Sequence, residues 1–241
     1  MLAIRRHSSQ DYAVLPDIDT TDVGIITADD QACLDEVGSC LLAAKAHSRF
    51  GLTLLHSHFP VHDDEMLLEE VNTDERAITV RPVRADHSSV FATNVCHDDA
   101  DQLVGLEFAS YQTLAGVAPI GDSDSNVLTG IVDILRRRAK IKRFGIRLLH
   151  DPLGLDGNVL LETSDLARRI LSSRSETGSP ALLQSIPTVF RWEEVRAGSG
   201  DGLTVDQGCM QYCRTVSRCV QPVRGSHDRG RSHELTGHES V

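Results

Sequence analysis

One eight-residue segment occurs twice in the sequence, and this repeat constrains the fold more than any other feature. "RFGLTLLH" at 49–56 matches "RFGIRLLH" at 143–150 in six of eight positions, at a constant offset of 94 residues. Downstream, "MLLE" at 66–69 matches "VLLE" at 159–162 after a one-residue gap, so Glu69 corresponds to Glu162. A repeat of this kind indicates that one structural unit is used twice in the chain.

Apolar residues precede both copies at the spacing of one helical face. These residues are Leu34, Val37, Cys40 and Leu41 in the first copy, and Leu128, Ile131, Ile134 and Leu135 in the second. Thr27 or Asp29 is a candidate N-cap for the first helix, and Ser123 to Ser125 for the second. The sequence therefore predicts a repeated helix-strand-strand unit over 29–70 and 123–163.

The segments around the two units are expected to extend one sheet. Apolar and β-branched content predicts strands at 77–83, 89–95 and 101–111, and a hairpin formed by 188–195 and 203–213. "SDLARRILSS" at 164–173 predicts a short helix with Ser164 as its N-cap. We expect an α+β fold with an internal duplication and a mixed or antiparallel sheet that carries its helices on one face. The expected organisation is a flexible segment at 1–22, one duplicated domain at 23–215 and a disordered tail at 216–241.

Composition narrows the class of protein. The net charge of −11 in 241 residues argues against nucleic-acid binding, apart from a local role for the basic run "RRRAKIKR" at 136–143. No apolar stretch approaches the roughly 20 residues that span a membrane, and the N-terminus lacks the pattern of a secretory signal. We expect a cytoplasmic or nuclear protein whose six cysteines are free thiols or metal ligands rather than a disulfide framework.

Two histidines at the end of the first repeated strand form the first candidate site. In a strand, residues i and i+2 point to the same face, so His56 and His58 can bind one metal ion. Glu65 or Glu69 would complete a site of two histidines and one carboxylate. The second copy has Pro152 in place of His58, so only one such site can exist. The alternative is that both histidines form hydrogen bonds at the end of a buried strand.

Both copies retain a histidine and a glutamate, namely His56 with Glu69 and His150 with Glu162. In each copy the histidine ends one strand and the glutamate ends the next. A hairpin would therefore place His56 near Glu69 and His150 near Glu162. We favour a structural hydrogen bond in each hairpin over a site formed by all four residues.

The C-terminal region contains the third candidate site. Cys209, Cys213, Cys219 and His227 provide thiolate and imidazole ligands of the kind that bind zinc. Cys209 and Cys213 are expected on one strand, however, where residues four apart are separated by about 13 Å. One ion cannot bind both without a bend in the strand.

The segment "RFGLTLLHSHF" resembles a strand of the RFG-x2-LLH type seen in uncharacterised proteins predicted from filamentous fungal genomes. That resemblance implies no activity, cofactor or site residue.

Two functional hypotheses follow. The first is a non-catalytic protein that binds a small molecule or a protein partner. The second is a metal-dependent enzyme, with Zn or Fe held by His56, His58 and a nearby carboxylate. The sequence favours the first hypothesis, because it contains no complete catalytic motif.

Overall fold

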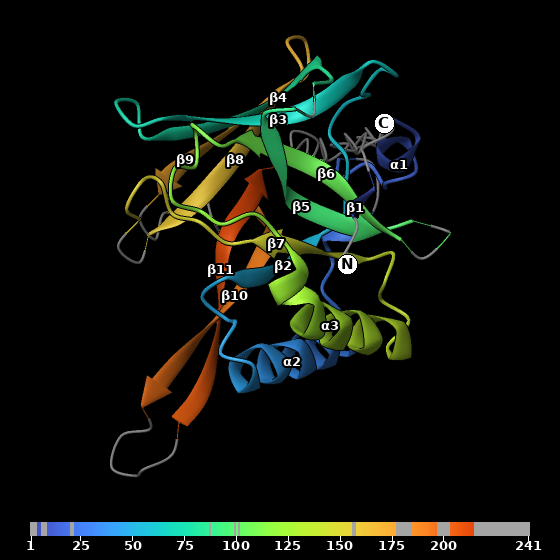
Figure 1. Cartoon of the computed structure of the whole chain (residues 1–241), viewed down its shortest axis with the longest axis vertical. Helices are drawn as coiled ribbons and strands as arrows, with labels where there is room; N and C mark the ends of the chain where they lie inside the picture. Colours follow the sequence, from blue (N-terminus) through green and yellow to red (C-terminus); the bar gives the residue numbers. More distant parts are fainter. Residues whose placement is uncertain are drawn as a thin grey trace, which may run out of the picture.

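Strands are the commonest regular structure among the described residues, and they form one sheet that closes on itself (Figure 1). The computed structural model describes residues 4–5, 9–19, 22–86, 88–98, 100, 102–155, 158–176, 185–196 and 203–214. The predicted tail at 216–241 lies outside these ranges, and so does part of the N-terminal segment 1–22.

The elements follow one another in this order along the chain: β1 (Ile4–Arg5), α1 (Ser9–Ala13), η1 (Asp22–Gly24), α2 (Ala28–Ala43), β2 (Phe50–Leu54), β3 (Glu65–Asn72), β4 (Ala77–Arg84), β5 (Val90–His97), β6 (Leu103–Ser110), η2 (Asp122–Asp124), α3 (Ser125–Arg137), β7 (Phe144–Leu148), β8 (Val159–Asp165), β9 (Ile170–Glu176), β10 (Ser185–Arg196) and β11 (Leu203–Arg214).

The sheet is a closed barrel of ten strands. Its order is β6-β3-β4-β9-β8-β11-β10-β2-β7-β5, and an antiparallel pairing of β5 with β6 closes the ring. The short strand β1 adds to β6 in parallel. The predicted α+β fold is therefore wrong. The strand segments were recognisable from their residue types, but closure depends on pairings between distant segments, which hydrophobic patterns do not encode.

The two copies of the repeated segment form neighbouring strands of the barrel and pair with each other. In the antiparallel ladder of β2 and β7, Phe50 faces Leu148 and Leu54 faces Phe144, so each copy meets the other symmetrically. Gly51 and Gly145 have equivalent surroundings, as the repeat predicts. A Cβ atom on Gly51 would lie 2.4 Å from the carbonyl oxygen of Phe190, and one on Gly145 would lie 2.7 Å from that of Val95.

The same symmetry extends beyond the predicted units of 29–70 and 123–163. On the opposite wall β4 pairs with β9, and the pairing is centred on Thr79 and Ser172. Strand β3 is parallel to β6 in the first half, and β8 is parallel to β11 in the second. Within the described residues, each half therefore consists of one α-helix followed by five strands.

Helices α2 and α3 lie side by side against the outer face of β2 and β7 (Figure 1). Leu34 and Leu41 of α2 belong to the same buried core as Leu128 and Leu135 of α3. Along β2 the side chains alternate: Phe50, Leu52 and Leu54 belong to this core, whereas Thr53 lines a polar cavity. The alternation separates an apolar face under the helices from a polar face inside the barrel.

Of the local elements predicted from the sequence, a helix cap and a hairpin are present and one helix is not. Thr27, one of the two predicted caps, is the N-cap of α2 and forms a capping box with Asp30. The segments 188–195 and 203–213 form the predicted hairpin, β10–β11. The helix predicted at 164–173 is wrong: β8 continues to Asp165, a turn follows and β9 begins at Ile170. Pairing of β8 and β9 overrides the local helical pattern.

The described part of the N-terminal segment is packed against the barrel. Tyr12 of α1 is buried in a small apolar cluster with Phe59 and Leu67. Further along, Ile18 donates its backbone N–H to the carbonyl oxygen of Ser57. These contacts hold the N-terminal segment beside the connection that carries His56 and His58.

Candidate metal centre

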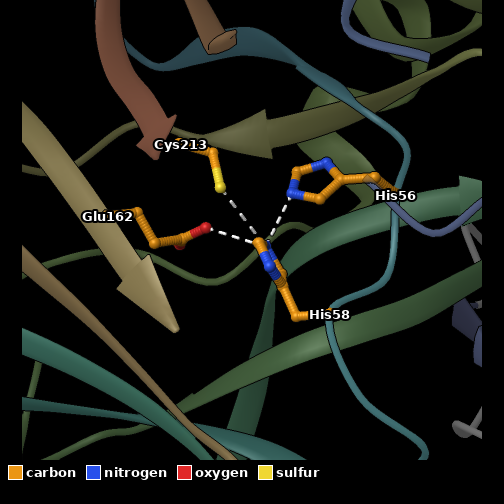
Figure 2. Close-up of side chains that lie close together, drawn as sticks. All are labelled: His56, His58, Glu162 and Cys213. Carbon is orange, nitrogen blue, oxygen red and sulfur yellow. Dashed lines mark hydrogen bonds and ion pairs between the residues drawn. The ribbon is translucent and has the colours of Figure 1, made fainter. Parts of the chain in front are cut away.

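Four potential metal ligands from three parts of the chain converge inside the barrel (Figure 2). His56 and His58 lie in the connection after β2, Glu162 lies on β8 and Cys213 lies near the end of β11. Their ligand atoms all lie within 4.8 Å of one another. We call these four residues the metal cluster. His56 is partly buried and the other three are buried.

The parallel ladder between β8 and β11 explains half of this arrangement. Glu162 and Cys213 are direct register partners in that ladder, so their side chains leave the sheet as neighbours. The two histidines approach from the end of β2 and bring their Nε2 atoms within 2.9 Å of each other. His56 and His58 thus lie close together, but both follow β2 and so do not share a strand face as predicted.

The atom at the centre of the cluster is Nε2 of His58 (Figure 2). It lies 2.9 Å from Nε2 of His56, 2.9 Å from Oε1 of Glu162 and 3.9 Å from Sγ of Cys213. A tetrahedral zinc ion separates nitrogen and oxygen ligands by about 3.3 Å, and nitrogen and sulfur by about 3.6 Å. The three distances to Nε2 of His58 therefore differ from those of a zinc site by a few tenths of an ångström, whereas ligand atoms that lie up to 4.8 Å apart would have to come closer together around an ion.

Three of the four candidate ligands each form a hydrogen bond with a further group that lies outside the cluster. Nδ1 of His56 lies 2.7 Å from the carbonyl oxygen of Leu54, and Nδ1 of His58 lies 2.9 Å from Oγ of Ser164. The side-chain amide of Gln211 donates to Oε2 of Glu162 at 2.7 Å. Outer partners of this kind orient metal ligands in known metalloproteins, because they fix the tautomer and direct the free atom to the ion.

The hydrogen bond of His56 to the backbone leaves its Nε2 atom without a proton and facing the other ligands. A carbonyl oxygen only accepts, so Nδ1 of His56 carries the proton that it donates to Leu54. Burial and the neighbouring His58 lower the pKa of His56 to about 4, so at neutral pH its Nε2 has no proton. That lone pair is directed at His58.

Glu162 directs one carboxylate oxygen toward the two histidines. Its Oε1 is buried and lies 2.9 Å from Nε2 of His58, which is close enough for an ion pair. Burial opposes ionisation of Glu162, but His58 outweighs that effect and lowers its pKa. Burial likewise opposes protonation of His58, and Glu162 outweighs it and raises the pKa.

Cys213 is a thiol in the absence of metal, because burial and Glu162 raise its pKa. Binding of a metal ion would replace that proton, as it does wherever a thiolate ligates.

A cavity of about 30 Å³ adjoins the cluster, large enough for one or two water molecules. His56, His58 and Glu162 line one side of it, and Glu107 and Arg147 also contribute.

The glutamates predicted as ligands have other partners. Glu65 forms a two-bonded ion pair with Arg169 at 2.6 and 2.7 Å. Glu69 bonds His150 at 2.5 Å and Arg147 at 2.7 Å. Neither belongs to the metal cluster.

Each of the two repeated histidines lies beside the glutamate of the opposite half and not beside the glutamate of its own half. His150 bonds Glu69, which belongs to the other half, and His56 lies beside Glu162, again in the other half. The pairs expected within each hairpin are therefore wrong. The exchange follows from the symmetric pairing of β2 with β7, because the end of each strand reaches the hairpin of the opposite half.

The symmetry-related position therefore holds a different group of residues, the arginine cluster: Glu69, Glu107, Arg147 and His150. Arg147 bonds both glutamates, and His150 donates from Nδ1 to the carbonyl oxygen of Leu148 as His56 does to Leu54. His150 and Arg147 outweigh the effect of burial and lower the pKa of Glu69 to about 2. Because Arg147 and His150 occupy the carboxylate oxygens of Glu69, this cluster is satisfied by itself.

The remaining predicted ligands lie elsewhere. Cys209 contacts the carbonyl oxygens of Val189 and Gln211, and it is outside the metal cluster as the strand geometry predicts. Cys219 and His227 lie outside the described residues.

Acidic side chains on α2 pair with much of the basic run at 136–143. Arg137 and Arg138 bond Glu36, while Lys140 and Arg143 pair with Asp30. The run therefore contributes to the packing of α3 on α2, which reduces the positive charge it offers to an external anion.

Sequence reasoning missed Glu162 and Cys213 as partners of His56 and His58. Both residues had been singled out, but each was assigned to another group. The correspondence between Glu69 and Glu162 was the available signal, since either glutamate could have been the partner of His56.

The fold and the cluster together define a closed β-barrel with a buried group of two histidines, one cysteine and one glutamate that could hold a metal ion. No known protein family, curated protein or solved structure showed significant similarity to this chain. Among the described residues, no helix is long and apolar enough to cross a membrane.

Proposed function

We propose that this protein binds one zinc ion through His56, His58, Glu162 and Cys213, and that the ion has a structural, non-catalytic role. The observation that carries the proposal is the pair of Nε2 atoms 2.9 Å apart, one of which has no proton to donate. A cation between them would bind both nitrogens and Oε1 of Glu162, which lies 2.9 Å from Nε2 of His58.

The ligand set favours zinc over iron. Thiolate and imidazole together suit Zn²⁺, and four protein ligands are typical of a closed, structural zinc site. The iron site with two histidines and one carboxylate needs open positions, one of which Cys213 would fill. The charges of Zn²⁺, a thiolate and a carboxylate also cancel, which suits a buried site.

The ion would connect the two halves of the barrel. His56 and His58 belong to the first half, whereas Glu162 and Cys213 belong to the second. Because binding requires all three chain segments in their folded positions, zinc affinity would add to the stability of the barrel.

Elemental analysis of purified protein after dialysis against a buffer containing zinc tests this proposal. We expect about one zinc per chain in the wild type and loss of the metal in His58→Gln and Cys213→Ser. Cys209→Ser is the matched control on the same strand and should retain zinc. Wild-type protein without bound zinc, or equal loss in both cysteine variants, would contradict the proposal.

A metal-dependent hydrolytic enzyme is the second candidate, because the cavity beside the cluster has room for water and includes Glu107. In such a site one protein ligand would give way to a water molecule, whose pKa the metal would lower. The absorption spectrum of cobalt-substituted protein separates the two candidates. Sulfur-to-cobalt charge transfer that disappears in Cys213→Ser indicates the closed site, whereas a spectrum that is unaffected by this change indicates the open one.

A further inference from the structure

The N-terminal segment lies against the connection that carries two of the four metal ligands. Residues 9–19, which we call the strap, run along the start of the connection between β2 and β3, where His56 and His58 are found. Tyr12 and Leu15 of the strap line the small cavity that His56 and His58 also line. The strap therefore forms part of the enclosure of the metal cluster.

Ser57, the residue between the two histidines, attaches this connection to the strap. Its backbone N–H donates to the carbonyl oxygen of Pro16 at 2.9 Å, and its carbonyl oxygen accepts from the N–H of Ile18 at 3.2 Å. The two bonds make an isolated bridge of the parallel type. The backbone N–H of His58 also donates to the hydroxyl oxygen of Tyr12, at 3.4 Å. The strap and the two histidines are therefore joined through a single residue and its neighbour.

Two buried apolar side chains anchor the strap. Tyr12 is 4% exposed and packs with Phe59 and Leu67, and Ile18 is 2% exposed and belongs to the large core. Between them the strap is partly exposed, and Val14 is 78% exposed. Within the described residues, the strap adds no strand to the barrel. A segment held by few buried side chains opens locally at a lower free energy than the whole protein unfolds.

We propose that the strap is a gate that controls the rate at which zinc enters and leaves the metal cluster. This inference rests on the proposed function, since it concerns the regulation of the same site. When the strap opens, Tyr12 leaves its apolar cluster and uncovers the cavity beside His56 and His58. Because Tyr12 packs on Phe59 and Leu67, its truncation destabilises the closed strap to the same extent with and without zinc. Entry and exit should then become faster together, with little change in the Kd for zinc.

Stopped-flow measurements of zinc uptake and zinc release, both followed with a chromophoric chelator at several concentrations, test the gate. Tyr12→Ala should raise both rate constants by about tenfold or more, since a tenfold change needs only about 1.4 kcal/mol of opening free energy, and the Kd should change less than about threefold. Leu15→Ala, a milder change at a partly buried position, should act in the same direction. Val14→Ala is the matched control in the same segment and should keep both wild-type rate constants.

The proposed function and the gate fail in different ways. Wild-type protein that takes up no zinc overturns the proposed function and the gate with it. If wild type binds zinc and the folded variants keep its rate constants, the gate alone is overturned; Leu15→Ala decides if circular dichroism shows that Tyr12→Ala is not folded. The gate is also overturned if release alone becomes faster and the Kd rises in proportion, because Tyr12 would then orient a ligand, as Ser164 does.

Discussion

The hydroxyl group of Ser164 allows a sensitive test of the metal cluster, because it touches no metal ligand except His58. Its Oγ lies 2.9 Å from Nδ1 of His58 and thereby holds the imidazole with Nε2 toward the cluster. Removal of an outer partner of this kind lowers metal affinity by about 10–100-fold in characterised sites. Ser164→Ala should therefore raise the Kd for zinc by that factor, which corresponds to about 1.4–2.7 kcal/mol.

The expected loss in the metal-free protein is smaller. One hydrogen bond contributes about 0.5–1.5 kcal/mol to the free energy of unfolding, so Ser164→Ala should still fold. Zinc affinity is measured by competition with a chromophoric chelator at constant pH. Thr163→Ala is the control, since Thr163 is the preceding residue of β8, is exposed and bonds the carbonyl oxygen of Ser172 instead.

Two results would refute this reasoning. If Ser164→Ala keeps wild-type zinc affinity while His58→Gln loses it, the hydroxyl does not orient the ring. If Thr163→Ala weakens zinc binding as much as Ser164→Ala does, the effect comes from the strand and not from the contact with His58.

Three further predictions concern stability. Thr27→Ala should lower the free energy of unfolding by about 1 kcal/mol in denaturant titrations, because it removes the cap of α2; an unchanged midpoint would contradict this. Burial opposes ionisation of Asp30, but Lys140 and the backbone of Thr27 outweigh it and lower the pKa from 3.8 to about 2. The stabilisation is therefore complete above pH 4 and lost as the pH falls toward 2, so unfolding of wild type should depend more steeply on pH in this range than that of Asp30→Asn, and parallel curves would refute it. Gly51→Ala should cost about 1–3 kcal/mol or more in the same assay, because the new methyl group would meet the carbonyl oxygen of Phe190, whereas Gly154→Ala meets no neighbouring atom and any loss there reflects only its positive φ.

The local elements of this protein could be predicted well from its sequence. Alternating apolar residues indicated most of the strands, the apolar face from Leu34 to Leu41 indicated α2, and Thr27 indicated its start. The failure at 164–173 has a physical cause. Leu166, Ile170 and Leu171 can follow a helical period, but the ladder between β8 and β9 gives Leu171 a buried position that a helix would not.

The metal cluster could be predicted only in part. His56 and His58 are two positions apart, so their proximity follows from local geometry alone. Glu162 and Cys213 are more than 100 residues from them, and nothing in the spacing indicates that β8 and β11 pair in parallel beside the end of β2. Each was instead assigned to neighbours in the sequence, His150 for Glu162 and Cys209 for Cys213.

The sequence by itself determined that one unit is used twice, that the two RFG segments are equivalent and that only the first copy has a second histidine. The tertiary structure alone decided that the sheet closes and that the halves exchange partners, so that His56 meets Glu162 while Glu69 bonds His150. The physical reason is that a repeat encodes the same local preferences in both halves, whereas contact between the halves is selected by the packing of the whole barrel. His58 and Cys213 occupy the positions at which the other half has Pro152 and Ala109. Their contact therefore depends both on the residue types at these positions and on the way the two halves pair.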